Sequence, residues 1–505
     1  MKKRNFRLLM VLPLSLLMTV LLTLVAPDDS RAASKLKISK AKWTAGKSTL
    51  DVAGKGWGSG TSVTVRDPAL GITLGTVQAN SKGAWSLTVT NPPNVPCWVW
   101  AQSTTGFADK AVKGAPVVCA STPTVKVFSF NNLGMHCYDS DFSVFSILPP
   151  FNTVNAQVVR RGAGVTNPVI LDDTQATVFF RAVADKRKSI NTTSANKTNF
   201  WDHVSALFAA SLPVDVGLTG VKMPGTGNIP QPFATYTPAM KWFTAEGIPI
   251  TALDNRNKQN TYPLMAIQPF DVSTSNVPAV TSTVLPVSDE MYCSNCHSTG
   301  GVAANSSTQT KYTIPAWSTS VITQIQYREN ILILHDAKRA TGLMAGKPIL
   351  CASCHYSPAL DLAGAGPQGD QVGKPMFSFA VHGRHGKDLN GNIPSATSPA
   401  IIPGVDVAAC YNCHPGTVTK CLRGAMGAAG ITCKDCHGGL LSVGGVYPTV
   451  PARTPWVNEP KCQSCHTGDA LVQMGNNIRL KVAYDNLLKD ELSPEHAESI
   501  RKRRL

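Results

Sequence analysis

Charged side chains are scarce in this 505-residue chain, where they make up only 15% of the residues. Acidic residues are the scarcer kind, because 31 Asp and Glu stand against 47 Lys and Arg and leave a formal net charge of +16. Such an excess normally points to nucleic acid or an anionic surface. No basic block is interleaved with aromatic side chains, however, so we expect no nucleic-acid partner. The low charge, with 40 Gly and 35 Pro, predicts many turns and modest helix content.

A cysteine is missing from the N-terminal leader. Residues 1–34 read as an export signal, in which four basic residues precede an apolar run over 8–26 and small residues surround Ala32. The missing thiol excludes a lipoprotein anchor, whereas an uncleaved membrane anchor stays open because the apolar run is long. We therefore expect an exported protein, in the periplasm or at the cell surface, for which membrane association is an open possibility.

One five-residue word, Cys-x-x-Cys-His, occurs five times in the second half of the chain. This is the attachment site of c-type haem, because two thiols add to the two vinyl groups of the porphyrin and the adjacent His binds iron from the proximal side. Zinc sites use Cys-x-x-Cys pairs two at a time and do not require the His. We expect five covalently attached haem c groups, whose roughly ten propionate charges would offset most of the positive charge. The words are Cys293-Ser-Asn-Cys296-His297, Cys351-Ala-Ser-Cys354-His355, Cys410-Tyr-Asn-Cys413-His414, Cys433-Lys-Asp-Cys436-His437 and Cys462-Gln-Ser-Cys465-His466.

The remaining patterns predict a multidomain chain. Short alternating runs over 35–120 indicate a β-sandwich of immunoglobulin-like architecture, and 121–290 is a second β-rich domain with one helix near 199–212. Residues 291–477 form a haem-packed domain with short helices and little regular secondary structure, since short loops between the haem words leave little room for an aliphatic core. The tail, 478–505, is expected to be helical and basic.

Five histidines outside the words are candidates for the distal side of the irons. A second His there is common in low-potential electron-transfer haems, Met raises the potential, and an open position admits a substrate. Two of the candidates, His382 and His385, are expected to bind two different haems, because Gly383 and Gly386 free the backbone between and beside them. The candidates are His335, His382, His385, His136 and His203, with Met344, Met376, Met426 and Met474 as substitutes.

Four cysteines lie outside the haem words. An exported chain meets oxidising conditions, so we expect a disulfide between Cys97 and Cys119, and a second between Cys137 and Cys421 that would hold His136 near the haems. Cys421 also forms a widely spaced alternative motif with the fourth word, but Cys433 offers that word the ordinary spacing.

Near His136, Asp139 and Asp141 are spaced as two oxygen ligands of a cation such as calcium could be. Two carboxylates are weak support for such a site, and we expect a solvated turn here instead.

The chain resembles the multihaem c-type cytochromes exported by metal-reducing and related anaerobic bacteria. The resemblance rests on the five words and on the segments Leu334-His335-Asp336, Cys351-Ala-Ser-Cys-His-Tyr356 and His382-Gly-Arg-His385-Gly, and it covers about residues 291–470. It implies electron transfer along stacked haems. An immunoglobulin-like domain ahead of the haems looks like that of a surface or extracellular member.

We therefore expect a pentahaem electron relay rather than an enzyme, because no acid–base or nucleophile constellation accompanies the haem words. Its partners would be redox proteins or an extracellular acceptor. Two alternatives stay open: a reductase of a small nitrogen or sulfur oxyanion with one open haem, and a surface cytochrome that assembles into filaments.

Overall fold

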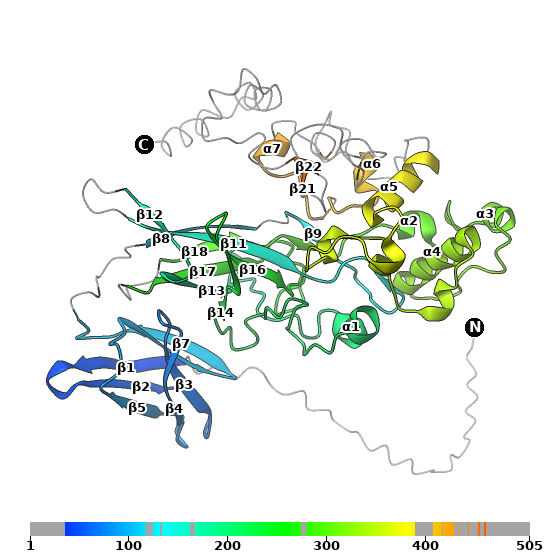
Figure 1. Ribbon diagram of the computed structural model, residues 1–505. Coiled ribbons are helices and arrows are strands. Elements are labelled where there is room, and N and C mark those ends of the chain that lie inside the picture. Colours follow the sequence, from blue (N-terminus) through cyan, green and yellow to red (C-terminus); the bar gives the residue numbers. More distant parts are fainter. Residues whose placement is uncertain are drawn as a thin grey trace, which may run out of the picture.

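The computed structural model describes residues 36–116, 119, 125–131, 134–161, 167–273, 279–388, 408–416 and 418–428, with single residues or pairs at 433, 443, 453–454 and 459–460. The leader, the C-terminal tail and the fifth haem word therefore lie outside the described residues. The described chain is rich in β-structure, with sandwich-like sheets and a few short helices, as expected (Figure 1). None of its helices has the length and apolar character needed to cross a membrane.

The first domain is a sandwich of two antiparallel sheets, ordered β1-β2-β5 and β4-β3-β6-β7. Alternate side chains of each strand point inward, so that Leu50 and Val52 from one sheet meet Val63 and Val65 from the other with no exposed surface. Its strands are β1 (Lys37–Thr44), β2 (Thr49–Lys55), β3 (Ser62–Asp67), β4 (Ile72–Gln78), β5 (Trp85–Thr90), β6 (Trp98–Ser103) and β7 (Gly106–Ala111), and a 3-10 turn (Ala45–Lys47) joins β1 to β2.

A disulfide joins Cys97 to Cys119, with their Cα atoms 5.3 Å apart. This is the pair predicted from the sequence. It fastens the start of β6 to the chain that follows β7, where the first domain ends.

The middle domain is a second sandwich. One sheet has the order β12-β11-β16-β15 with β8 also pairing with β11, and the other has the order β14-β13-β17-β18. Val154 and Val158 of β11 and Phe180 of β13 lie in the shared core. The elements are β8 (Val125–Asn131), β11 (Asn152–Arg160), β12 (Val169–Leu171), β13 (Ala176–Val183), α1 (Phe200–Phe208), β14 (Gln231–Pro232), β15 (Thr235–Thr237), β16 (Trp242–Ile248), β17 (Leu264–Asp271) and β18 (Thr281–Val284).

Aromatic side chains join the two sandwiches. Trp100 of the first packs edge-on against Phe179 and Phe270 of the second, with ring centres 4.7 and 5.3 Å apart. Thr177 adds a hydrogen bond of 3.0 Å from its hydroxyl to the carbonyl of Pro68. A buried apolar contact of this kind holds the two domains in a fixed relation.

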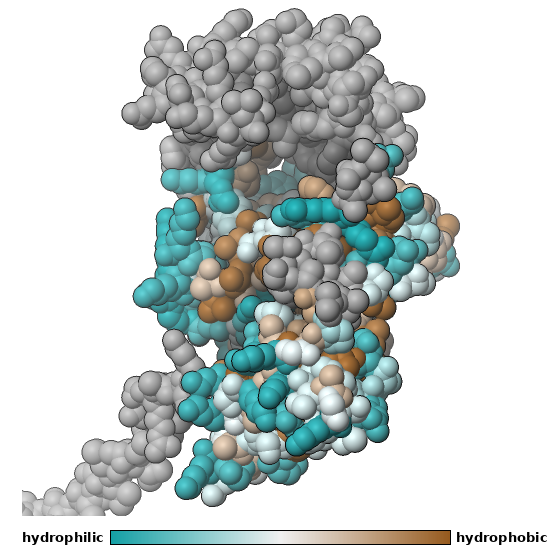
Figure 2. Space-filling model, turned by 90° about the vertical axis from the view of Figure 1, so that its left-hand side faces the viewer, coloured by the Kyte–Doolittle hydropathy of each residue, from teal (hydrophilic) through white to brown (hydrophobic). Residues whose placement is uncertain are grey.

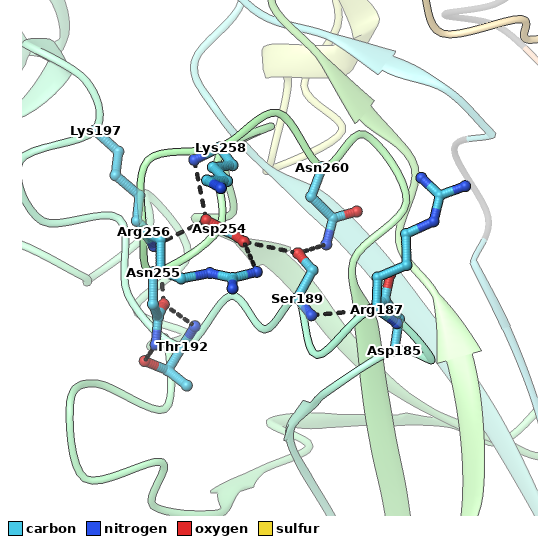
Figure 3. A network of polar contacts seen from close by, with 10 residues as sticks. All are labelled: Asp185, Arg187, Ser189, Thr192, Lys197, Asp254, Asn255, Arg256, Lys258 and Asn260. Atoms are coloured by element: carbon cyan, nitrogen blue, oxygen red, sulfur yellow. Dashed lines mark hydrogen bonds and ion pairs between the residues drawn. The ribbon is translucent and has the colours of Figure 1, made fainter.

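A polar network also holds the long loops of the middle domain, in addition to the apolar side chains that they bury (Figure 3). Asp254 accepts hydrogen bonds from the amides of Arg256 and Lys258 and from the hydroxyl of Ser189. Burial alone would raise the pKa of this carboxyl, but the amides of Lys258 and Arg256 outweigh burial and lower the pKa to about 2. The Asp254 carboxyl is therefore ionised near neutral pH, and as a carboxylate it accepts the hydrogen bonds that hold the loop.

The surface differs between the two sandwiches. In the face shown in Figure 2, hydrophilic residues cover most of the lower part of the molecule, and apolar residues gather in patches above it. Exposed apolar side chains of the middle domain include Phe128, Val169 and Ile170, which are 62%, 50% and 38% exposed.

The third part, called here the helical region, comprises residues 293–428. Two short parallel strand pairs, β9 with β19 and β10 with β20, tie the middle domain to the helical region and to the segment before it. Its apolar clusters are small, for example the cluster of Val144, Phe145 and Leu332 against which Met344 packs. The short elements are β9 (His136–Cys137), β10 (Phe145–Ser146), β19 (Val287–Ser288), β20 (Ile349–Leu350), α2 (Ser294–His297), α3 (Ser306–Lys311), α4 (Thr323–Arg339), α5 (Phe377–Asp388), α6 (Ala408–Tyr411) and α7 (Ala425–Ala428); 3-10 turns lie at Leu343–Gly346, Cys351–Ser353, Pro358–Leu360 and Gly369–Gln371, and a short strand pair is formed by β21 (Arg453–Thr454) and β22 (Glu459–Pro460).

Candidate functional site

The first three haem words fold into the same single turn of helix. In each, the amide of the His donates to the carbonyl of the first Cys, at 2.9 Å in the first word, 3.0 Å in the second and 2.9 Å in the third. Residues four apart lie on one face of a helical turn. The turn therefore presents the two thiols and the imidazole of each word together, and we number these sites 1, 2 and 3.

At site 1, His297 of α2 faces His385 of α5. The ring centres are 6.3 Å apart and the ring planes are nearly perpendicular, at 87°. Burial, and then the nearby His385 and Lys338, lower the pKa of His297 to about 4. The ring is therefore neutral near pH 7, and neutral imidazole is the form that binds metals.

At site 2, His355 faces His335, which lies near the end of α4. Here the ring centres are 6.5 Å apart and the planes cross at 80°. Burial first, and then the neighbouring His355, lower the pKa of His335. A second imidazole thus again lies opposite the imidazole of the word, but here it comes from α4 and not from α5.

At site 3, His414 faces His382 of α5. These rings are 5.8 Å apart and almost parallel, at 7°. Sites 1 and 3 therefore draw their second histidines from the same helix, whereas site 2 draws its own from α4.

Hydrogen bonds to Nδ1 fix the orientation of several of these rings. Nδ1 of His355 bonds to the carbonyl of Pro375 at 3.0 Å, that of His382 to Ser378 at 2.7 Å, and that of His385 to Val381 at 2.8 Å. Because a carbonyl only accepts, Nδ1 carries the proton and Nε2 is the nitrogen suited to a metal.

His335 is oriented by a relay of two side chains. The hydroxyl of Thr341 donates to Asp336 at 2.7 Å, so its oxygen accepts from Nδ1 of His335 at 2.9 Å. Sequence reasoning missed Thr341. The carboxylate directly after His335 was the available signal, since metal-binding histidines often depend on a nearby carboxylate for their tautomer.

The three pairs of rings fit an iron between two imidazoles. A metal bonded to two opposed imidazole nitrogens at about 2 Å each separates the ring centres by roughly 6 Å, which matches the three separations. Among the described residues, no group of three or more His, Cys, Asp or Glu gathers as a metal site made by protein alone would require. Haem needs only two axial protein ligands, so the donor set fits haem better than a bare ion.

The thiols of the first word do not have the character of a redox dithiol. Burial raises the pKa of Cys293 to about 11 and raises that of Cys296. A redox-active Cys-x-x-Cys pair requires at least one thiol with a lowered pKa. This observation disfavours disulfide exchange as the role of the first word.

His136 was predicted as a distal ligand, and this prediction is wrong. Its ring is only 3% exposed, packs against Phe151 at 3.9 Å between ring centres, and uses Nε2 for a 2.9 Å hydrogen bond to the carbonyl of Pro149. Burial lowers its pKa to about 4. His136 is a core residue of the middle domain.

His203 also lies apart from the three sites. It is on α1, whose buried face is formed by Phe200, Val204 and Leu207, and within the described residues no histidine ring lies opposite it. The helix packs on the core of the middle domain through these three residues.

The predicted disulfide between Cys137 and Cys421 is absent, and both thiols are free. The Cys421 thiol instead donates to the carbonyl of Pro415 at 3.0 Å and contacts the hydroxyl of Tyr411. Burial, followed by the Cys421 thiol and Glu290, raises the pKa of Cys137 to about 12. The two cysteines are neighbours without a bond.

The expected solvated turn at Asp139 and Asp141 is also wrong. Asp139 is fully buried and accepts from the amides of Ile147 and Leu148 at 2.7 and 3.0 Å. Asp141 accepts from the amide of Ser143. Oδ2 of Asp139 and Oδ1 of Asp141 hold the turn through these hydrogen bonds.

The last two words are incompletely covered by the structure. In the fourth word, Cys433 is described and is half-buried, whereas Cys436 and His437 lie outside the described residues. All of the fifth word, with Cys462, Cys465 and His466, lies outside as well. Their haem attachment stays a prediction.

No protein-family model matches the chain, and no curated protein matches it. Solved structures that do match include a biofilm-associated protein BSP domain (12% identity, 50% of this chain and 30% of that one, TM-score 0.13). Others are a tetra-tandem repeat from the extending region of a large adhesion protein (11%, 50% and 49%, 0.15) and the Yersinia pseudotuberculosis adhesin InvE (13%, 50% and 58%, 0.14). The chain thus spans less than two thirds of each. TM-scores this low carry no argument about the chain.

Proposed function

We propose that this protein is an exported pentahaem c-type cytochrome that relays electrons between redox partners, in anaerobic or extracellular respiration. The observation that supports it best is that each of three Cys-x-x-Cys-His turns faces a second histidine, supplied by α4 or α5. The ring centres of each pair are about as far apart as an iron between them requires. Bound haem supplies one-electron chemistry at its iron.

The chain's own residues would hold each haem and close its axial positions. The paired cysteines would form the thioether links, and His297, His355 and His414 would bind from the proximal side. His385, His335 and His382 would bind from the distal side in the same order. With both axial positions filled, these sites offer no place for a substrate, which favours the relay over a reductase.

The β domains would act as the outer support of the relay. We propose that the first is of immunoglobulin-like type and that it extends the molecule away from the haems at the cell surface. The basic leader with its apolar run supports export, and covalent haem attachment in bacteria takes place outside the cytoplasm.

Intact mass tests the cofactor. The purified protein should exceed its polypeptide mass by five haem groups, and Cys354→Ser should lose or weaken one attachment, because one thioether partner is gone. Cys137→Ser is the matched control and should retain five. A mass equal to the bare polypeptide would contradict the proposal.

Optical spectra test the distal assignment. His335→Ala should open one iron and convert one haem from low spin to high spin, with a change in the potential of that centre, because the axial ligand is a principal control of both. The matched control His203→Ala changes a half-buried histidine of α1, which has no histidine ring opposite it among the described residues, and it should leave the spectrum unchanged. If His335→Ala also leaves it unchanged, His335 is not a ligand.

A further inference from the structure

One helix supplies the second histidine of two sites. His382 and His385 lie three residues apart on α5, and side chains at that spacing have Cβ atoms roughly 5–6 Å apart. His385 faces His297, and His382 faces His414. The distal sides of sites 1 and 3 are therefore fixed to each other by a single turn of backbone.

The proximal sides of the same two sites also touch. The amide of Tyr292, just ahead of the first word, donates to the carbonyl of Cys413 at 3.2 Å. The side-chain amide of Asn295, inside the first word, donates to the carbonyl of Asn412 inside the third word at 3.3 Å. Words that are far apart in the sequence are thus bonded directly to each other.

Site 2 takes its histidines from other parts, although α4 also touches site 1, where the side-chain amide of Asn330 donates to the carbonyl of His297 at 2.8 Å. Its second histidine comes from α4, and the carbonyl of Pro375, ahead of α5, orients its proximal His355. The haem that follows site 1 in the sequence is therefore held by a different helix from the one that sites 1 and 3 share.

The two sites on α5 differ in the angle between their imidazole planes. The planes are nearly perpendicular at site 1, at 87°, and nearly parallel at site 3, at 7°. Parallel imidazoles separate the energies of the two iron d orbitals that overlap with ligand π orbitals, whereas perpendicular imidazoles leave those energies nearly equal. Low-spin ferric iron consequently gives a rhombic electron-spin-resonance signal in the first case and a signal with one very large g value in the second.

From these contacts we infer that α5 joins sites 1 and 3 into a closely coupled haem pair, in which site 1 is of the large-g type and site 3 of the rhombic type. The inference rests on the proposed function and adds to it part of the order of the relay: the first haem exchanges electrons more directly with the third than with the second. Site 2, at 80°, is a second large-g centre outside the pair.

Electron spin resonance on the full chain, loaded with haem, tests this. His382→Ala should remove one rhombic signal, and His385→Ala and His335→Ala should each remove one large-g signal and create a high-spin iron. The high-spin iron at site 1 should broaden the rhombic signal of site 3 several-fold more than the high-spin iron at site 2 does. His335→Ala is thus the matched control, and the signals of the fourth and fifth haems persist in all three variants.

Two results would overturn the inference: loss of the rhombic signal in His385→Ala instead of His382→Ala, or stronger broadening from site 2 than from site 1. Should an alanine variant fail to fold, His382→Met keeps a ligand on the iron and should shift the potential of the rhombic centre upward; a shift in a large-g centre instead would overturn it. Intact mass separates the two proposals. A chain without haem overturns both, and a haem-loaded chain with the wrong assignment overturns only the pairing.

Discussion

The β domains and the helical region differ in what fills their interiors. Both sandwiches enclose large continuous cores of aliphatic and aromatic side chains, in which residues such as Leu50 and Phe180 have no exposed surface. The helical region contains only small clusters, such as that of Ala304, Ile314, Trp317 and Leu334. Burial of apolar area is the main driving force of folding. The described part of the helical region thus has a smaller apolar core than the β domains, and under the proposed function bound haem would supply the rest of it.

Removal of the haem thiols should have the largest effect, because it should unfold the helical region and leave the β domains folded. A variant with Ser at all ten haem-word cysteines should lose hydrogen-exchange protection across α4 and α5, because their histidines no longer meet iron. Protection in β2, β11 and β13 should persist. Cys137→Ser, outside the words, is the control, and it should retain hydrogen-exchange protection in both the helical region and the β domains. Unchanged protection in α4 and α5 would mean that the helical region folds without haem.

Acid should weaken the middle domain through His136. Burial lowers its folded-state pKa from 6.5 to about 4, so the unfolded chain takes up a proton below pH 6.5 that the folded domain refuses until pH 4. The stabilisation is complete above pH 6.5 and is lost as pH falls to 4, by about 3 kcal/mol. Denaturant unfolding at several pH values measures it. Burial raises the pKa of Asp139 to about 6, which acts in the opposite direction over the same range. The contribution of His136 is therefore measured as the difference between the slopes of His136→Gln and His203→Gln, and equal slopes would contradict the assignment.

Glu290 joins the segment ahead of the first word to residues 418 and 419 of the helical region. Its carboxylate accepts from the amides of Val418 and Thr419 at 3.1 and 3.2 Å and from the hydroxyl of Tyr292. Glu290→Gln should cost about 1–2 kcal/mol, because a charged acceptor of two amides is lost. Hydrogen exchange at Val418 and Thr419 should accelerate accordingly. Glu246→Gln, at an exposed position, is the control, and equal exchange rates in both variants would show that the carboxylate does not hold the junction.

Local patterns in the sequence were sufficient for much of the fold. Alternation of apolar residues predicted both β-rich domains, and the paired cysteines 97 and 119 form the expected disulfide. The spacing of Cys, Cys and His within each word also predicted which side chains share a face, because that face depends on only one turn of backbone.

Long-range arrangement was beyond the reach of these patterns. A lone histidine such as His136 looks the same in sequence whether it meets iron or a proline carbonyl in a core, since the difference depends on the packing of distant strands. The same holds for Asp139, which reads as a solvated turn residue and is buried. The sequence predicted that His382 and His385 serve different haems, but which proximal histidine each faces became visible only in three dimensions.

The pairing of β10 with β20 has a consequence for the order of assembly. Phe145 and Ser146 pair with Ile349 and Leu350, roughly 200 residues later and directly ahead of Cys351. Contacts between such distant segments form late, because the intervening chain must be present before the loop can close. Under the proposed function, the first word would leave the export channel while this strand of the middle domain still lacked its partner, and Cys293 and Cys296 would be reached by the attachment machinery on an open chain. Closure at Leu350 would then follow, after the first haem is in place.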